Sequence, residues 1–207
     1  MTGKNPTVFY LTGLGGKLNK GLGQALSDLE VAYSGISYSG SFESLSHIDK
    51  LALVKSKLSE FIEMGGNKLV AVSAGGLLIV ELLEEHMHRD EVKQSKSKVI
   101  NPFLKKILAN DVTEKPESEI TIETIVKVDF SKIEILLLSP VLPYNPTIVN
   151  QPKSLRVIFG SEDYLYSEFK TNNLLNSIPN SSLLLSDGAG HSLPHDCVRS
   201  ELISLIS

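Results

Sequence analysis

The chain has 207 residues, of which 42% are hydrophobic and 21% are charged, and its formal net charge is −4 at pH 7. This balance excludes a disordered chain, which would contain fewer apolar residues and more charge, and the slight acidity excludes the basic surface expected of a nucleic-acid-binding protein. The single cysteine excludes an internal disulfide, and the length predicts one domain.

The first predicted element is a strand at Val8–Leu11, which runs into a glycine-rich loop at Thr12–Gly16. Such a loop lets backbone N–H groups come close to a substrate oxygen. Its glycines match neither the Gly-x-x-x-x-Gly-Lys-Ser/Thr spacing nor the Gly-x-Gly-x-x-Gly spacing, so a phosphate-binding loop is not expected. A short helix is then predicted at Asn19–Leu29, and a weaker strand pattern lies near Val31–Tyr38.

A serine follows the next buried strand. The helical pattern at Leu45–Met64 leads to an apolar run at Leu69–Val72, then to Ser73, and then to a second helical pattern at Gly75–Glu85. A strand-to-helix turn of this kind holds a nucleophile in a strained conformation, so its neighbours must be small. The helix would also direct its N-terminal amides toward charge that develops near Ser73. A serine in such a turn is also typical of an ordinary helix N-cap.

Residues 88–132 interrupt the alternation of strands and helices. They hold 17 of the 44 charged residues of the chain. A connection between a helix and a strand needs only a few residues, so we interpret 88–132 as an insertion. It forms either a solvated decoration or a lid over a site. His86 and His88 lie two residues apart, a spacing that does not share a helix face, so no metal site is expected there.

A carboxylate follows the second strand that is predicted after residues 88–132. Apolar runs at Ile133–Leu138 and Leu155–Phe159 predict two further strands, and the second leads through a glycine turn to Asp163. An imidazole base needs a carboxylate that orients it. Asp163 suits this role, Glu162 is its direct rival, and a turn or helix cap is the alternative for either.

A histidine follows the last predicted strand, Leu183–Leu185. His191 lies in the glycine-rich loop after it, whereas His195 lies near the start of a helix predicted at Leu193–Ile206. A histidine beyond a strand of an α/β sheet is placed where such sheets bind ligands. Cys197 falls within the last helix with no tight turn around it, so we interpret it as a packed, partly buried thiol.

The order of the elements predicts an α/β protein. Strands that alternate with helices indicate a three-layer α/β/α sandwich with about six mostly parallel strands. Near-continuous apolar runs predict strands that are buried on both faces. The loops that carry Ser73, Asp163 and His191 would then meet at the carboxyl edge of the sheet. A serine activated by a histidine, itself oriented by an aspartate, is an acyl-transfer triad.

These loops resemble those of the α/β-hydrolase superfamily, in its small serine-hydrolase members. Thr12–Gly16 is similar to the His-Gly-x-Gly oxyanion loop, and Ala71–Gly75 is similar to the Gly-x-Ser-x-Gly elbow. Gly160–Asp163 is similar to the Gly-x-x-Asp acid loop, and Gly190-His191 is similar to the terminal Gly-His pair. The resemblance covers most of the chain outside 88–132.

The resemblance implies that Ser73 is the nucleophile, His191 the base and Asp163 the residue that orients it. The backbone N–H groups of Leu14 and Ala74 are expected to form the oxyanion hole.

The chain departs from the family pattern in several places. Thr12 stands where histidine is usual, and Ala71 stands where glycine is usual. The first two antiparallel strands of larger members are not expected. The insertion precedes the strand that the family's lid commonly follows, so only Ser139–Lys153 is left as a short lid.

These residues predict a metal-independent, cofactor-free serine hydrolase that cleaves a carboxylic ester or thioester through an acyl-enzyme. Two alternatives remain. The first is a non-catalytic ligand- or protein-binding module on the same fold. The second is an acyltransferase or a carbon–carbon bond hydrolase with the same triad. We expect one domain over residues 1–207 with 88–132 inserted in it.

The expected substrate is a small acyl compound, held by Gly13 and by apolar residues near the ends of the strands. The apolar lining residues that we expect are Phe42, Val141, Leu142, Tyr144, Tyr164, Leu165 and Leu193. No apolar stretch reaches the ~18 residues of a membrane span, and the first residues lack the pattern of a signal peptide. We therefore expect a cytoplasmic protein that binds no nucleic acid, with 88–132 as the segment that would bind a protein partner.

Overall fold

The computed structural model describes residues 5–84 and 128–207, which belong to one compact unit of the chain. These residues form a six-stranded sheet in the order β2-β1-β3-β4-β5-β6, and every neighbouring pair is parallel. The strands are β1 (Val8–Leu11), β2 (Tyr33–Ile36), β3 (Lys68–Val72), β4 (Glu134–Leu138), β5 (Ser154–Gly160) and β6 (Ser181–Ser186).

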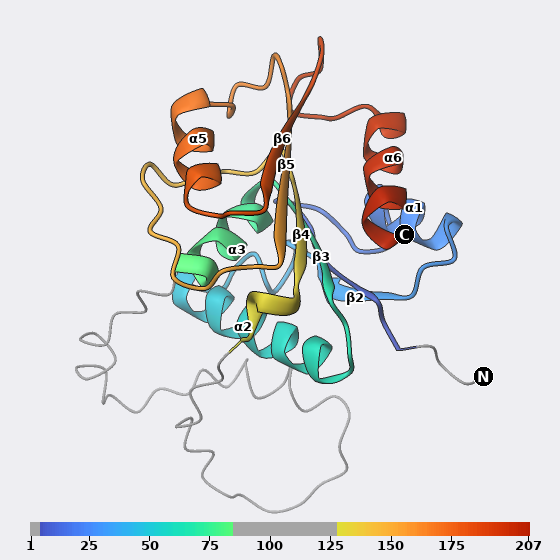
Figure 1. The fold of residues 1–207 in the computed structure, drawn as a ribbon. Coiled ribbons are helices and arrows are strands. Elements are labelled where there is room, and N and C mark those ends of the chain that lie inside the picture. Colours follow the sequence, from blue (N-terminus) through green and yellow to red (C-terminus); the bar gives the residue numbers. More distant parts are fainter. Residues whose placement is uncertain (1–4, 85–127) are drawn as a thin grey trace, which may run out of the picture. The chain divides into compact units, whose positions relative to one another are not determined.

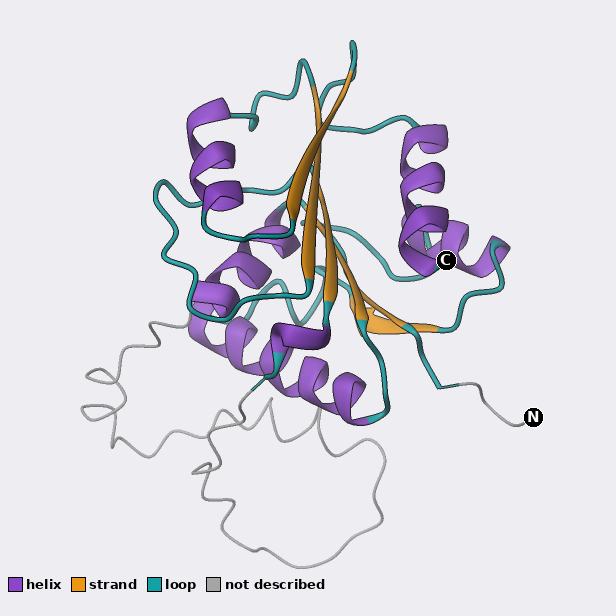
Figure 2. Ribbon diagram, viewed as in Figure 1, coloured by secondary structure: helices purple, strands orange, loops and turns teal. Residues whose placement is uncertain are grey.

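Helices cover both faces of this sheet. They are α1 (Leu22–Asp28), α2 (His47–Glu63), α3 (Ala74–Glu84), α5 (Glu168–Asn176) and α6 (His195–Ile206), with a short 3₁₀ helix η1 (Phe130–Lys132) before β4. Helices α2, α3 and α5 lie on one side of the sheet, whereas α1 and α6 lie on the other (Figures 1 and 2). The predicted three-layer sandwich of mostly parallel strands is thereby confirmed.

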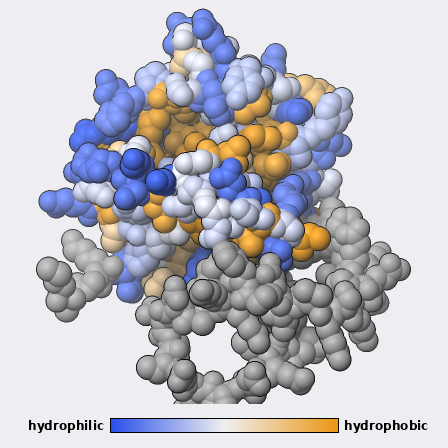
Figure 3. Space-filling model, turned by 180° about the vertical axis from the view of Figure 1, so that it is seen from behind, coloured by the Kyte–Doolittle hydropathy of each residue, from blue (hydrophilic) through white to orange (hydrophobic). Residues whose placement is uncertain are grey.

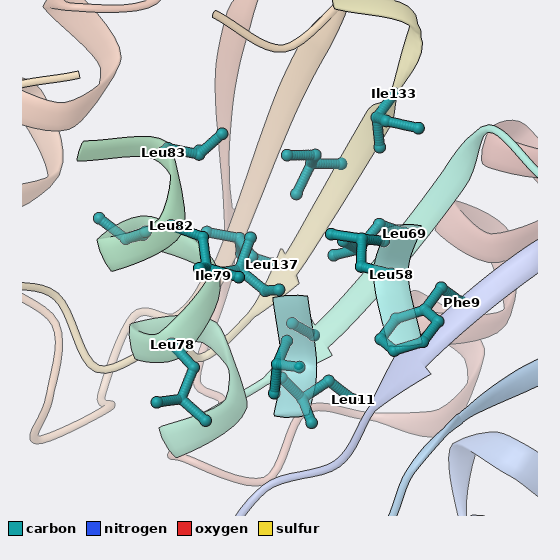
Figure 4. Packing of buried hydrophobic residues seen from close by; sticks show 14 of the residues in the cluster. Phe9, Leu11, Leu58, Leu69, Leu78, Ile79, Leu82, Leu83, Ile133 and Leu137 are labelled. Atoms are coloured by element: carbon teal, nitrogen blue, oxygen red, sulfur yellow. The ribbon is translucent and has the colours of Figure 1, made fainter. Parts of the chain in front are cut away.

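The core on the α2/α3/α5 side explains why these segments are helical. Ser46 caps the N-terminus of α2 by accepting a hydrogen bond from the Asp49 N–H, and the apolar stripe of α2 faces the sheet. Figure 4 shows side chains of α2 and α3 packed against those of β1, β3 and β4. Phe9 and Phe61 meet in this layer, with ring centroids 5.7 Å apart.

The alternate residues of the same strands build a second core against α1 and α6. Val8 and Tyr10 of β1 belong to this core, while Phe9 and Leu11 belong to the first one. Strand β1 is therefore buried on both faces, as its unbroken apolar run predicts.

The last strand differs from this expectation. In β6, Leu184 is 37% exposed and Leu185 is 41% exposed. Since β6 pairs only with β5 and forms an edge of the sheet, its apolar run Leu183–Leu185 is not covered on both faces. The prediction of full burial was wrong for this strand.

One weakly predicted element forms, and one element was not predicted at all. Strand β2 forms although it contains Ser34 and Gly35, and a Cβ atom on Gly35 would lie 1.8 Å from the carbonyl oxygen of Tyr10. A glycine is thus required where β2 lies against β1. Helix α5 has no predicted counterpart, because it buries only Thr171 and Leu174 and so shows almost no apolar stripe.

Figure 3 shows apolar residues gathered in the upper middle of one face, with polar residues around them. None of the helices among residues 5–84 and 128–207 is both long and apolar enough to span a membrane. Most of the predicted insertion, together with His86 and His88, lies outside the described residues.

Candidate active site

Ser73 lies in the turn between β3 and α3 with a φ angle of 51°. Few residues other than glycine adopt this left-handed conformation, and it persists only where the surroundings enforce it. Here the Ser73 N–H donates to the Leu138 carbonyl oxygen at 3.0 Å, and the Ser73 carbonyl oxygen accepts from the Val141 N–H at 3.1 Å. The end of β4 therefore holds the turn in place.

The two glycines after Ser73 have no room for a side chain. A Cβ atom on Gly75 would lie 2.6 Å from the Thr12 carbonyl oxygen, and one on Gly76 would lie 2.7 Å from the Pro140 Cβ. The first residues of α3 can therefore approach both the loop after β1 and the loop after β4. This packing requires glycine at both positions, in line with the expectation of small neighbours around Ser73.

The three residues predicted to form a triad lie in one hydrogen-bonded chain. The Ser73 Oγ is 3.0 Å from His191 Nε2, and His191 Nδ1 is 3.1 Å from each carboxylate oxygen of Asp163. An ionised carboxylate can only accept a hydrogen bond, so Nδ1 carries the proton. Nε2 is then free to accept the proton of the Ser73 hydroxyl.

Asp163 is held firmly behind the histidine. Its side chain has no exposed surface, and Oδ1 also accepts a hydrogen bond from the Leu165 N–H at 2.9 Å. The neighbouring Glu162 has an exposed side chain and makes no contact with His191 among the described residues. Of the two rival carboxylates, the structure thus brings Asp163 to the imidazole.

The loops that carry the acid and the histidine are joined directly. The Glu162 N–H donates to the Ala189 carbonyl oxygen at 2.9 Å, and the Gly188 N–H donates to Ser161 Oγ at 2.8 Å. A Cβ atom on Gly160 would lie 2.0 Å from the Ala189 carbonyl oxygen. These contacts keep the loop after β5 and the loop after β6 at a constant separation.

The glycine-rich loop after β1 lies against Ser73. A Cβ atom on Gly13 would lie 3.1 Å from the Ser73 Cβ, so only glycine allows this approach without a shift. The next amide, Leu14 N–H, donates to no acceptor among the described residues. Ala74 is the first residue of α3, whose N–H has no partner within the helix. Both predicted oxyanion-hole amides are therefore available to a ligand.

Thr12 ties this loop to the sheet. Its side chain is buried, its Oγ1 accepts a hydrogen bond from the Tyr38 N–H at 2.6 Å, and its hydroxyl donates to the Gly13 carbonyl oxygen at 3.2 Å. The Gly15 N–H adds a bond to the Tyr38 carbonyl oxygen at 2.7 Å. Thr12 stands where the similar family has histidine. Its hydrogen bonds thus fix the glycine-rich loop to the segment after β2.

A cavity of about 900 Å³ opens beside Ser73 and His191. Its lining includes the predicted residues Gly13, Leu14, Tyr164 and Leu193. Tyr164 packs against the imidazole, with the two ring centroids 5.3 Å apart.

Several predicted lining residues do not line this cavity. They are Phe42, Val141, Leu142, Tyr144 and Leu165. The cavity extends toward α1 and α6, whereas Phe42 and Leu142 are buried in the core on the opposite side of the sheet. Following a strand is therefore not enough to place a residue in the site.

Other lining residues were missed by the sequence analysis. They include Tyr10, Lys17, Lys20, Leu22 and Val198. Lys17 and Lys20 follow the glycine-rich loop directly, so their position in the sequence could have indicated them. Val198 lies far from the motifs along the chain, and only the packing of α6 brings it to the site.

Among the described residues, the other histidines and the cysteine form no second cluster of site residues. His195 begins α6, lines the cavity and lies 3.7 Å from the carboxylate of its neighbour Asp196. Cys197 is partly buried against the α1/α6 side of the core. Within residues 5–84 and 128–207, no group of His, Cys, Asp and Glu side chains could hold a metal ion.

Known structures share this fold at low sequence identity. One, from Xanthomonas campestris pv. campestris, is described as a candidate hydrolase of the alpha/beta superfamily; it is 12% identical over 95% of this chain and 97% of that chain, with a TM-score of 0.55. Paleococcus ferrophilus monoacylglycerol lipase is 11% identical over 97% of this chain and 96% of that chain, with a TM-score of 0.53. Thermogutta terrifontis esterase 2, phosphorylated by paraoxon, is 13% identical over 99% of this chain and 83% of that chain, with a TM-score of 0.56.

No protein-family model matches the chain, and no curated protein matches its sequence. The likeness to solved structures therefore establishes the architecture alone. Together with the six-stranded parallel sheet and the position of the loops, it shows that the chain has the α/β-hydrolase fold.

Proposed function

We propose that this protein is a serine hydrolase that cleaves a carboxylic ester or thioester through an acyl-enzyme on Ser73. The observation that carries the proposal is the continuous chain from Ser73 Oγ through the His191 ring to the buried Asp163 carboxylate, with contacts of 3.0 and 3.1 Å. A serine hydroxyl is a weak nucleophile unless a base accepts its proton, and this geometry supplies the base.

The reaction has two halves. His191 Nε2 takes the Ser73 proton as Oγ forms a bond to the acyl carbon, and the resulting oxyanion is held by the Leu14 and Ala74 N–H groups. His191 then gives the proton to the leaving alcohol or thiol as the old acyl bond breaks. In the second half His191 activates a water molecule, which releases the acid and restores the Ser73 hydroxyl. Asp163 stabilises the imidazolium in both halves.

This mechanism needs no cofactor, since the triad and the two amides supply the nucleophile, the base and the charge stabilisation. In this proposal the chain acts as one domain in the cytoplasm. Residues 88–132 are a decoration or a lid, and they are the segment that would bind a protein partner. Proteins with the same fold include a lipase and an esterase, which supports the choice of ester substrates.

Hydrolysis of p-nitrophenyl butanoate and of an S-butanoyl thioester tests the proposal. We expect turnover by the wild-type chain and a loss of about 10³-fold or more in Ser73→Ala. Ser59→Ala, on α2 and away from the cavity, is the matched control and should retain full activity. Absence of turnover by a well-folded wild-type chain would favour the non-catalytic binding module. Transfer of the acyl group to an added alcohol in preference to water would favour the acyltransferase.

A further inference from the structure

The ionisable side chains that line the cavity beside Ser73 are mainly basic, although the chain as a whole is acidic. The formal net charge of the chain is −4. Two lysines, Lys17 and Lys20, and the imidazoles of His191 and His195 line the cavity, and no aspartate or glutamate of the described residues does. A cavity with cationic and hydrogen-bond-donating walls, in an acidic protein, favours a ligand that carries negative charge.

The two lysines are held next to the oxyanion loop. The Lys20 N–H donates to the Lys17 carbonyl oxygen at 3.2 Å, so a single turn carries both side chains. Leu18, between them, is fixed at both ends: its N–H donates to Ser37 Oγ at 3.0 Å, and its carbonyl oxygen accepts from the Tyr33 hydroxyl at 3.1 Å. The backbone under the lysines is thus positioned, while the side chains are exposed.

Neither ammonium group is neutralised by a described residue. Lys17 and Lys20 form no ion pair with any carboxylate of residues 5–84 and 128–207, whereas Lys57, Lys68 and Lys153 each do. The charge of Lys17 and Lys20 is therefore available to a bound molecule.

A second, independent observation lies on the sheet itself. Tyr10, in β1, lines the same cavity and is only 5% exposed, and its hydroxyl has no hydrogen-bond partner among the described residues. Its oxygen is not among the fully buried oxygens that lack a partner, so the hydroxyl group is open to the cavity. Burial, with a smaller effect from the neighbouring Tyr33, raises the pKa of Tyr10 to about 12, so the phenol stays a neutral donor.

We propose that the substrate of this site carries an anionic group in addition to its scissile ester, that Lys17 and Lys20 bind this anion, and that the Tyr10 hydroxyl donates to a polar atom of the substrate. This inference rests on the proposed function. It names the substrate class as acidic esters, whose carboxylate lies either in the acyl part or in the alcohol part.

Two matched pairs of esters test the inference and separate these two positions. For the acyl part, the p-nitrophenyl monoester of glutaric acid is compared with p-nitrophenyl 5-methylhexanoate, which is neutral and similar in shape. For the alcohol part, 4-carboxyphenyl butanoate is compared with 4-carbamoylphenyl butanoate. We expect one pair to show a kcat/KM ratio of anionic to neutral ester of about tenfold, since two exposed ion pairs contribute modestly.

Variants and salt identify the source of this preference. The double variant Lys17→Gln/Lys20→Gln should bring the ratio close to one, and so should added NaCl, which screens exposed charges. Lys57→Gln, on α2 outside the cavity, should keep the wild-type ratio. Tyr10→Phe should lower kcat/KM for the preferred anionic ester about fivefold without lowering the melting temperature, because the deleted hydroxyl has no partner among residues 5–84 and 128–207.

The two proposals fail in different ways. Ser73-dependent hydrolysis of the neutral esters with a ratio at or below one in both pairs would overturn this inference and leave the serine hydrolase intact. A preference for the anion that survives in Lys17→Gln/Lys20→Gln would also overturn it, because the anion would then bind elsewhere. No Ser73-dependent hydrolysis of any of the four esters or of the S-butanoyl thioester would overturn the proposed function and this inference with it.

Discussion

Asp163 and Glu162 are neighbours along the chain, yet their environments differ completely. The Asp163 carboxylate is fully buried, contacts His191 with both oxygens and accepts a backbone N–H, whereas the Glu162 side chain is exposed. The sequence alone could not decide which of the two orients His191, because both are carboxylates in the same loop. The turn that begins at Gly160 decides which of them faces inward.

This difference yields a prediction on activity. Asp163→Asn preserves the shape of the side chain but favours the wrong imidazole tautomer, so kcat for p-nitrophenyl butanoate should fall about 10³- to 10⁴-fold. Glu162→Gln, the matched control one residue away, should keep kcat within about twofold of wild type, because an exposed side chain without contact to His191 contributes little. Steady-state kinetics of both variants check this, and a larger loss in Glu162→Gln would reverse the assignment.

At the scale of elements, the turn between β3 and α3 depends on the absence of side chains. The α3 residue Gly75 lies against the carbonyl oxygens of Leu11 and Thr12, which belong to β1 and the loop after it. Elsewhere in a helix, alanine is more stable than glycine by about 1 kcal/mol. At Gly75, close packing should instead make alanine less stable than glycine.

We therefore expect Gly75→Ala to lower the free energy of unfolding by about 1–3 kcal/mol, because the new methyl group displaces the loop after β1. Ester turnover should fall as well, since this loop carries the Leu14 amide. Gly190→Ala, where a Cβ atom meets nothing within 4 Å, is the control for stability. Urea unfolding measures both variants, and an unchanged or raised free energy for Gly75→Ala would contradict the described packing.

A cluster of charged side chains at the opposite end of the sheet should make the stability of the protein depend on pH. Glu134, at the start of β4, accepts a hydrogen bond from Lys153 at 2.7 Å and pairs with Lys68 at 3.3 Å. The hydrogen bond from Lys153, assisted by Lys68, holds the pKa of Glu134 below its ordinary value of 4.5 although partial burial opposes this. A lowered pKa in the folded state stabilises the protein above the unfolded-state pKa and loses that contribution as pH falls.

Glu134→Gln should accordingly lower the free energy of unfolding by about 1 kcal/mol at pH 7, as expected for a partly exposed pair. The difference from wild type should shrink as the pH drops below 4.5 and the wild-type carboxyl becomes protonated. Urea unfolding between pH 7 and pH 3 measures it. A difference that stays constant over this range would mean that the carboxylate charge contributes nothing.

The elements differ in how far the sequence could predict them. Helix α2 and strand β3 follow from strong apolar patterns, because each is determined by what it buries. Helix α5 buries too little to show a stripe, and the partial exposure of β6 depends on its place at the sheet edge, which no local pattern contains. The cavity wall was predicted least well, because Tyr10 and Val198 reach it from different elements and through the packing of both.

At the scale of the whole molecule, the predicted catalytic residues all lie at one edge of the sheet. Loops after β1, β3, β5 and β6 bring the glycine-rich loop, the serine, the acid and the histidine to the same cavity, although Ser73 and His191 are 118 residues apart. Parallel strands make this convergence a geometric consequence of the fold. The order of the motifs along the chain was therefore sufficient to predict that Ser73, Asp163 and His191 lie together, whereas the direction of the cavity toward α1 and α6 could not be predicted from it.

The central claim is that Ser73 is an activated nucleophile. Treatment of the folded chain with a fluorophosphonate, followed by intact-mass measurement and peptide mapping, tests it most directly. We expect one covalent adduct located on Ser73, its loss in Ser73→Ala and its retention in Ser59→Ala. An unmodified, well-folded wild-type chain, or an adduct on another residue, would contradict the account.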